Sequence, residues 1–194
     1  MFYECTSLMK APELNSTSLA RGCYSSMFAG CEKLRKVQGE LPATELAESC
    51  YSCMFERCNN LEMPPVLPAI SLTENCYSYM FGESEYLERV TRLPATTLAV
   101  WCYGYMFQFT KITHSPDLYA DQLQENCYRG MFYGCGNLKY IKCRAANNVS
   151  TTCLQDWVQG VASNGRFVRR SGTNIWPTGT SGIPNGWTVE QSWN

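Results

Sequence analysis

Residues 76–81 read Cys-Tyr-Ser-Tyr-Met-Phe, and the same phrase, Cys-Tyr-x-x-Met-Phe, recurs along most of the chain. The Met-Phe pairs begin at Met1, Met27, Met54, Met80, Met106 and Met131. The intervals between them are 26, 27, 26, 26 and 25 residues. A fixed period of this length is typical of solenoids, in which each unit packs only on its neighbours. The sequence therefore predicts a solenoid and directs the functional question toward its surfaces.

The composition excludes several classes of protein. The chain has 194 residues, of which 45% are hydrophobic and 17% are charged, as expected for a folded protein and not for a disordered one. The formal net charge of -1 provides no basic excess for a nucleic-acid partner. No apolar run approaches the roughly 18 residues that a membrane span needs. We therefore predict neither a nucleic-acid partner nor a transmembrane segment.

Ten of the twelve cysteines fall into two columns, each with one position per repeat. The first column comprises Cys23, Cys50, Cys76, Cys102, Cys127 and Cys153, and the second comprises Cys5, Cys31, Cys58 and Cys135. Stacked repeats place equivalent residues about 5 Å apart, and free cysteine packs as a small hydrophobe. We therefore predict two reduced ladders in the core. Disulfides between neighbouring rungs and a zinc site are the less favoured alternatives, and we expect no metal or other cofactor.

Each repeat predicts a short strand followed by a helix. In the second repeat, residues 34–37 alternate apolar with charged side chains, which is typical of a half-buried strand. Thr44 then occupies a position suited to a helix N-cap. Leu46, Cys50 and Met54 follow at i, i+4 and i+8, which predicts a helix of about three turns with one apolar face. The predicted fold class is α/β, with short parallel β-strands on one face of the solenoid and helices on the other.

Three phrases of the repeat carry a resemblance to a known family. They are Cys-x-x-Leu at residues 31–34, Leu-Pro-Ala-Thr-Glu-Leu-Ala at residues 41–47 and Cys-Tyr-x-x-Met-Phe at residues 76–81. Together they resemble the BspA-like leucine-rich repeats of anaerobic gut and oral bacteria over residues 1–156. The resemblance implies a right-handed leucine-rich-repeat solenoid of six repeats of about 26 residues. It also implies a secreted or cell-surface protein with a role in adhesion, any leader or lipid anchor lying outside this chain.

The period ends after Asp156, where Trp157-Val158 replaces Met-Phe. Residues 157–194 contain short strand-like runs between Gly, Pro and Asn turns. We therefore predict a small β-rich C-terminal segment that caps the last repeat, as solenoids require for solubility. The alternative is a carbohydrate-stacking patch made by Trp176, Trp187 and Trp193.

No catalytic constellation appears in the sequence. His114 is the only histidine and has no matched nucleophile in the sequence. Neither a phosphate-binding loop nor a dinucleotide-binding motif is present. We therefore predict that the protein is not an enzyme.

The predicted ligand-binding site is a column of residues that point outward from the strands of successive repeats. Its members are Lys10, Lys36, Met63, Arg89, His114 and Tyr140. The column is basic and partly aromatic, which suits an acidic protein or a glycan, although an ordinary solvated sheet face has the same composition. The predicted function is binding or adhesion at the cell surface. The alternative is a structural spacer or an accessory subunit, because the chain opens inside a repeat at Met1, where upstream repeats or a partner subunit would cover the edge.

Overall fold

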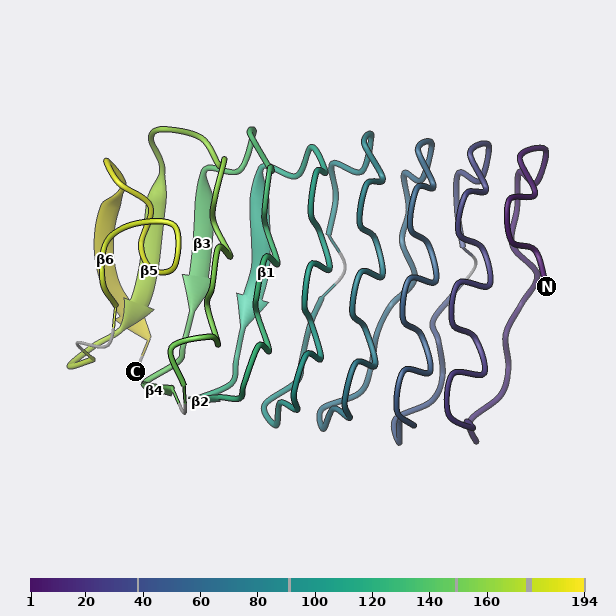
Figure 1. Ribbon diagram of the computed structural model, residues 1–194, viewed down its shortest axis with the longest axis horizontal. Coiled ribbons are helices and arrows are strands. Elements are labelled where there is room, and N and C mark those ends of the chain that lie inside the picture. Colours follow the sequence, from purple (N-terminus) through teal and green to yellow (C-terminus); the bar gives the residue numbers. More distant parts are fainter. Residues whose placement is uncertain (38, 91, 149, 174–175, 194) are drawn as a thin grey trace.

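The protein is a solenoid of stacked coils. Its computed structural model describes residues 1–37, 39–90, 92–148, 150–173 and 176–193. Successive coils lie side by side along one axis, and the two termini lie at opposite ends of the stack (Figure 1). All the paired strands run parallel, so the fold is a parallel β-solenoid. The predicted solenoid is confirmed.

The regular strands of the described residues lie in the C-terminal half. They are β1 (His114–Leu118), β2 (Gln122–Leu123), β3 (Tyr140–Cys143), β4 (Asn147–Asn148), β5 (Arg166–Arg170) and β6 (Thr188–Trp193). One sheet has the order β1-β3-β5-β6, and a second sheet pairs β2 with β4. Toward the N-terminus isolated parallel bridges, such as that between Lys10 and Lys36, continue the first sheet. Pro12 follows closely and lacks the amide that a ladder needs, which explains why pairing there stays short.

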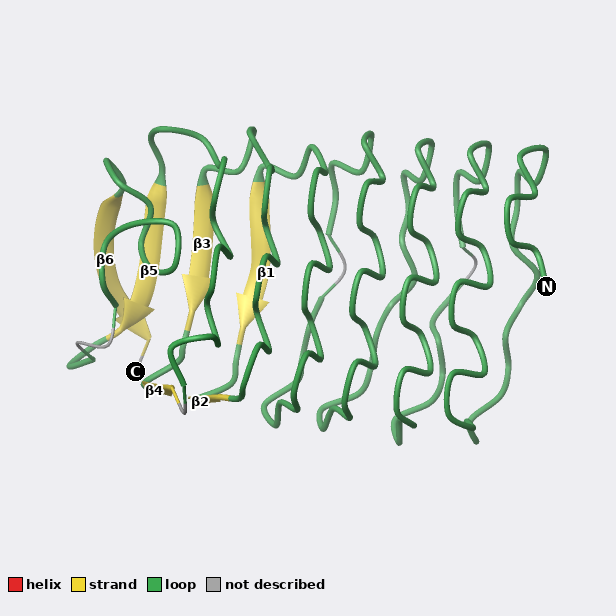
Figure 2. Cartoon of the chain, viewed as in Figure 1, coloured by secondary structure: helices red, strands yellow, loops and turns green. Residues whose placement is uncertain are grey.

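The predicted helices are wrong, because none of the described residues is helical and the segments opposite the strands are runs of turns (Figure 2). The amides of Cys50 and Met54 each donate to the carbonyl oxygen three residues earlier, at 3.2 Å. Ser49 and Cys53, one residue before them, have φ angles of 56° and 54°. A positive φ at the third residue is typical of a tight turn. The predicted α/β leucine-rich-repeat class is therefore wrong as well.

Hydrogen bonds between coils explain why these segments are not helical. The amide of Tyr51 donates to Cys76 at 3.1 Å, and that of Phe55 donates to Met80 at 2.9 Å, both in the next coil. A helix would use such donors within itself, whereas the run of turns uses alternate amides to join neighbouring coils. The apolar residues recur in pairs every four residues. Over so short a segment, this period is close enough to 3.6 to imitate a helix.

Two ladders of stacked aromatic rings run through the core. The first comprises Phe2, Phe28, Phe55, Phe81, Phe107 and Phe132, with neighbouring centroids 5.4–6.0 Å apart. The second comprises Tyr24, Tyr51, Tyr77, Tyr103, Tyr128 and Trp157, with neighbouring centroids 5.7–6.2 Å apart. These distances lie in the range of favourable aromatic stacking. Each repeat therefore buries its rings against those of its neighbours, and one core extends along the whole stack.

The second cysteine column does more than fill space. The thiol of Cys58 donates to the carbonyl oxygen of Phe28 at 3.1 Å. The hydroxyl of Ser84 donates in the same way to Phe55 at 2.8 Å. A serine can therefore replace the cysteine without leaving a buried carbonyl unpaired. The sequence predicted only small hydrophobes here, whereas the structure has a row of hydrogen-bond donors that join neighbouring coils.

The thiols differ in exposure, and this leads to a testable prediction. All twelve cysteines are free; nine are buried, whereas Cys5 and Cys23 are exposed. Burial raises the pKa of Cys50 and of Cys135 to about 11. Because the thiolate is the reactive form, we expect an aromatic disulfide reagent at about pH 8 to modify Cys5 and Cys23 quickly. The buried thiols should react only as the protein unfolds.

Stopped-flow absorbance of the released reagent would measure this reaction. Replacing Cys5 and Cys23 with serine should remove the fast phase, apart from a slower contribution from the half-buried Cys53. A fast phase of unchanged amplitude in this double variant would contradict the burial of the two ladders.

The C-terminal segment continues the same sheet. β5 pairs with β3, and β6 pairs with β5. Trp157 stacks on the last tyrosine of its ladder and donates through Nε1 to the carbonyl oxygen of Gly182 at 2.7 Å. Trp176 and Trp187 are only 8% and 7% exposed. Their rings pack in the interior, so the alternative of a carbohydrate-stacking patch is wrong for these two residues.

Candidate functional site

The predicted ligand-binding column lies on the outer side of the sheet formed by the strands, which we call the strand face. The register pairs Lys10 with Lys36, and Lys36 with Met63. It also pairs His114 with Tyr140 across β1 and β3. Lys10, Lys36, Met63, Arg89 and His114 are exposed, and Tyr140 is half-buried. The structure brings two of the six into ring contact, with the centroids of His114 and Tyr140 5.5 Å apart.

The column continues beyond Tyr140 into the C-terminal segment. Arg166 and Thr188 are the next residues in register, on β5 and β6. The Cζ atom of Arg166 lies 4.9 Å from the ring centroid of Tyr140, and its guanidinium lies 3.5 Å from the carboxylate of Glu190. Sequence reasoning missed this role of Arg166 because the repeated motif ends before it. Only the pairing of β5 with β3 aligns it with the column.

A second row of side chains lies beside this column, on β1, β3 and β6 and at the residue that follows β1. The Nζ atom of Lys142 lies 3.1 Å from the carboxylate of Asp117 and 4.1 Å from the ring centroid of Trp193. The ring of Tyr119 meets that of Trp193 edge to face at 5.3 Å. All four side chains are half-buried. Ion-pair and cation–π contacts of this kind restrict each side chain to one arrangement, so the row offers a partly ordered surface.

A third group of charges follows at the end of the same strands. The Oδ1 atom of Asp121 lies 3.0 Å from nitrogen atoms of both Arg144 and Arg170. Such half-exposed pairs contribute little to stability. Two guanidinium groups on one carboxylate leave one positive charge in excess, which favours an acidic group on a ligand.

A shallow pocket of about 540 Å³ opens in the middle of the strand face. Its lining residues are Asn60, Glu62, Met63, Tyr86, Glu88 and Arg89. Met63 and Tyr86 are 59% and 54% exposed, and the Nζ atom of Lys111 lies 4.1 Å from the ring centroid of Tyr86. Sequence reasoning selected Met63 and Arg89 for this surface. It missed Tyr86, which lies outside the column because it precedes the strand position of its repeat.

The chemistry of the strand face is suited to recognition, since its cations and rings offer hydrogen bonds and stacking surfaces. The Nδ1 atom of His114 lies 3.0 Å from the hydroxyl of Thr113, the preceding residue. Both side chains are exposed, so water competes for this bond. Within the described residues, no group of three or more His, Cys, Asp or Glu side chains is placed to hold a metal ion.

Comparisons with known proteins add no identification. Protein-family models, curated proteins and solved structures were compared with this chain, and none of them matches it. In the part of the chain that the structure describes, there is no helix long and apolar enough to cross a membrane. The geometry of the strand face therefore carries the functional argument.

Proposed function

We propose that this protein is a non-enzymatic binding module that recognises a protein or a glycan through its strand face. The observation that carries the proposal is the alignment of His114, Tyr140 and Arg166 in one continuous column, with ring and cation contacts between successive members. Aromatic and arginine side chains dominate binding energy at protein interfaces. A column that crosses successive coils suits an extended ligand better than a small molecule in a closed cavity.

We further propose that the protein lies on the cell surface or is secreted, and that its binding serves adhesion. The resemblance of the repeats to BspA-like surface proteins supports this location. The alternative function is that of a structural spacer or accessory subunit in a larger surface complex, for which the strand face would need no ligand of its own.

The strand face is tested by replacing Arg89, His114 and Tyr140 together with alanine. We expect the triple variant to lose about tenfold or more in affinity for its ligand, because each truncation of an interface anchor removes roughly 1 kcal/mol or more. Its melting temperature should stay within a few degrees of the unsubstituted protein, since two of the side chains are exposed. The measurement is binding to an array of matrix proteins and glycans, with calorimetric melting in parallel.

A matched control replaces exposed side chains away from the strand face. Arg21→Ala with Tyr3→Ala removes one arginine and one tyrosine, both exposed, and should leave binding unchanged. Equal affinity of the triple variant and the unsubstituted protein would contradict the proposal. An unsubstituted protein that binds nothing on the array would favour the spacer or accessory subunit.

A further inference from the structure

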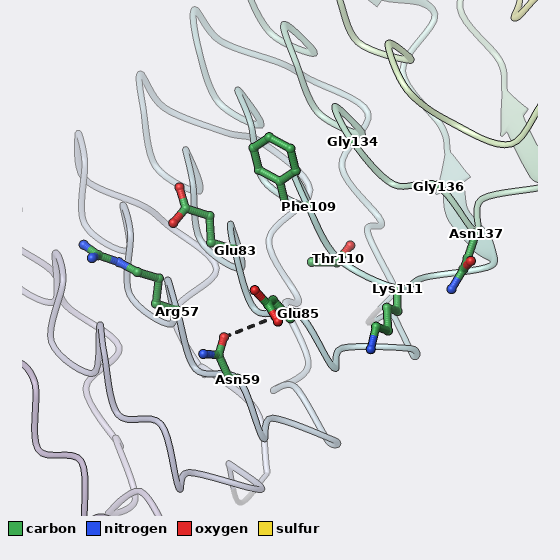
Figure 3. A pocket seen from close by; sticks show the side chains of 10 residues that line it. All are labelled: Arg57, Asn59, Glu83, Glu85, Phe109, Thr110, Lys111, Gly134, Gly136 and Asn137. Carbon is green, nitrogen blue, oxygen red and sulfur yellow. Dashed lines mark hydrogen bonds between the residues drawn. The ribbon is translucent and has the colours of Figure 1, made fainter.

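A second cavity, of about 620 Å³, lies beside the pocket of the strand face, where the run of turns in each coil passes into the strands. Its lining residues Asn59 and Glu85 directly precede Asn60 and Tyr86 of that pocket. Side chains from successive coils line the cavity, including Arg57, Glu83 and Phe109 (Figure 3). Because it crosses these coils, the cavity is a groove along the solenoid, which we call the corner groove. Its volume is in the range that binds small ligands.

The corner groove carries large side chains at one of the turn positions that have a positive φ. Arg57, Glu83 and Phe109 have φ angles of 55°, 58° and 56°. Gly30 and Gly134 occupy the same repeat position in other coils, with φ angles of 71° and 73°. This left-handed conformation suits glycine and disfavours bulky side chains. Three successive coils thus place large side chains in the groove, at a turn position that other coils fill with glycine.

Phe109 supplies the apolar surface of the groove. Its side chain is 48% exposed, whereas the phenylalanines of the core ladder from Phe28 to Phe132 are buried. A Cβ atom on Gly134 would lie 2.3 Å from Cδ1 of Phe109, so the ring covers the glycine of the next coil. Figure 3 shows the ring between Glu83 and Gly134. The edge-to-face contact with Tyr133, at 5.4 Å between centroids, fixes the ring further. The groove therefore has an ordered aromatic ring with a solvent-exposed surface.

The polar groups around the ring carry no net charge. Arg57 and Lys111 are positive, and Glu83 and Glu85 are negative. Among the described residues, none of these four side chains forms an ion pair within 4.0 Å. Asn59 accepts a hydrogen bond from the amide of Glu85 at 3.5 Å, and its own side-chain amide adds donors to the lining. Donors and acceptors are thus interspersed, and the charges balance.

We propose that the corner groove binds a short neutral oligosaccharide, with one sugar ring stacked on Phe109. The negative face of an aromatic ring attracts the weakly positive C–H groups on the flat side of a pyranose. Interspersed donors and acceptors match sugar hydroxyls, because each hydroxyl both donates and accepts hydrogen bonds. An anion would meet Glu83 and Glu85, a cation would meet Arg57 and Lys111, and an apolar peptide would find only Phe109. This site adjoins the strand face but uses a different aromatic ring, and it goes beyond the function proposed for that face.

The test measures binding of neutral trisaccharides by isothermal titration calorimetry and saturation-transfer NMR. The panel contains maltotriose, cellotriose, laminaritriose, mannotriose and chitotriose. We expect at least one to bind, and Phe109→Gly to weaken that binding about tenfold or more. This variant places a glycine at position 109, as the next coil has at position 134, so the backbone strain falls and we expect the variant to fold. Tyr105→Gly is the matched control, because Tyr105 has a φ of 54° and its ring covers Gly130 of the next coil, as the ring of Phe109 covers Gly134.

Tyr105→Gly should bind the trisaccharide within about twofold of the affinity of the unsubstituted protein. The strand-face variant with alanine at positions 89, 114 and 140 should do the same. Three results would overturn the proposal. They are an absence of binding by every trisaccharide, equal affinity of Phe109→Gly and the unsubstituted protein, and equal losses in Phe109→Gly and Tyr105→Gly. If the strand-face variant alone loses trisaccharide binding, the glycan belongs to the strand face, and only the groove proposal fails.

Discussion

Replacing Phe81 with alanine should lower the free energy of unfolding by about 3–5 kcal/mol, the usual range for a buried phenylalanine. Phe81 is fully buried, and its ring stacks on Phe55 at 5.8 Å and on Phe107 at 5.6 Å. Truncation removes both contacts and leaves a cavity between two coils. Because stability in a solenoid is the sum of repeats and of the interfaces between neighbours, both interfaces of one repeat weaken together.

Equilibrium unfolding in guanidinium chloride, followed by circular dichroism, would measure this loss. Phe2→Ala is the matched control, since Phe2 is half-buried and, among the described residues, its ring stacks on Phe28 alone. Its replacement should cost about 1–2 kcal/mol, because less apolar area leaves water on folding. Equal losses in the two variants, or a loss below about 1 kcal/mol for Phe81→Ala, would show that the stacked ladder does not hold the coils together.

Raising the pH should unfold the protein cooperatively over a narrow range above about pH 9. Burial raises the pKa of Cys50 to about 11 and that of Cys76 to about 12. It also raises the pKa values of Tyr103 and Tyr128 well above their ordinary value. A raised pKa in the folded state means that folding favours the neutral form. The stabilisation is complete below the unfolded pKa values, near 8.5 and 10, and is lost as the pH rises through the folded ones.

The expected slope is steep because many groups act together. Each buried thiol or phenol that ionises only in the unfolded chain lowers stability by about 1.4 kcal/mol per pH unit above its unfolded pKa. The summed loss from several such groups exceeds the total stability of a typical folded protein, about 5–15 kcal/mol, within a few pH units. Tyrosinate absorbance at 295 nm and far-ultraviolet circular dichroism should therefore change together. Phenols that titrate gradually while the circular dichroism stays native would contradict the burial of the tyrosine ladder.

The two cysteine ladders also set a control for this experiment. Cys23 is exposed, so Cys23→Ser should leave the alkaline midpoint unchanged. Cys102 is fully buried, and burial raises its pKa well above the ordinary value. Cys102→Ala removes one such group. It should make the loss of stability with pH less steep, even where the variant is less stable at neutral pH.

The candidate site could be predicted from the sequence in part. The repeat period aligned His114 with Tyr140, because equivalent positions of stacked repeats become neighbours. Arg166 joined the column only through the pairing of β5, in a segment where the period has ended. The corner groove could not be predicted from the sequence. Neither the positive φ of Phe109 nor its contact with Gly134 follows from local residue types.

The sequence by itself determined that the chain is a solenoid and that ten of its cysteines align in two columns, because a strict period stacks equivalent residues of successive repeats on one another. It did not determine the backbone between the strands. Leu46, Cys50 and Met54 fit a helix as well as they fit turns that repeat every four residues. The choice was made by alternate amides, such as that of Tyr51, which bond to the next coil. Those partners exist only in the stacked structure, so tertiary hydrogen bonding decided what local periodicity left open.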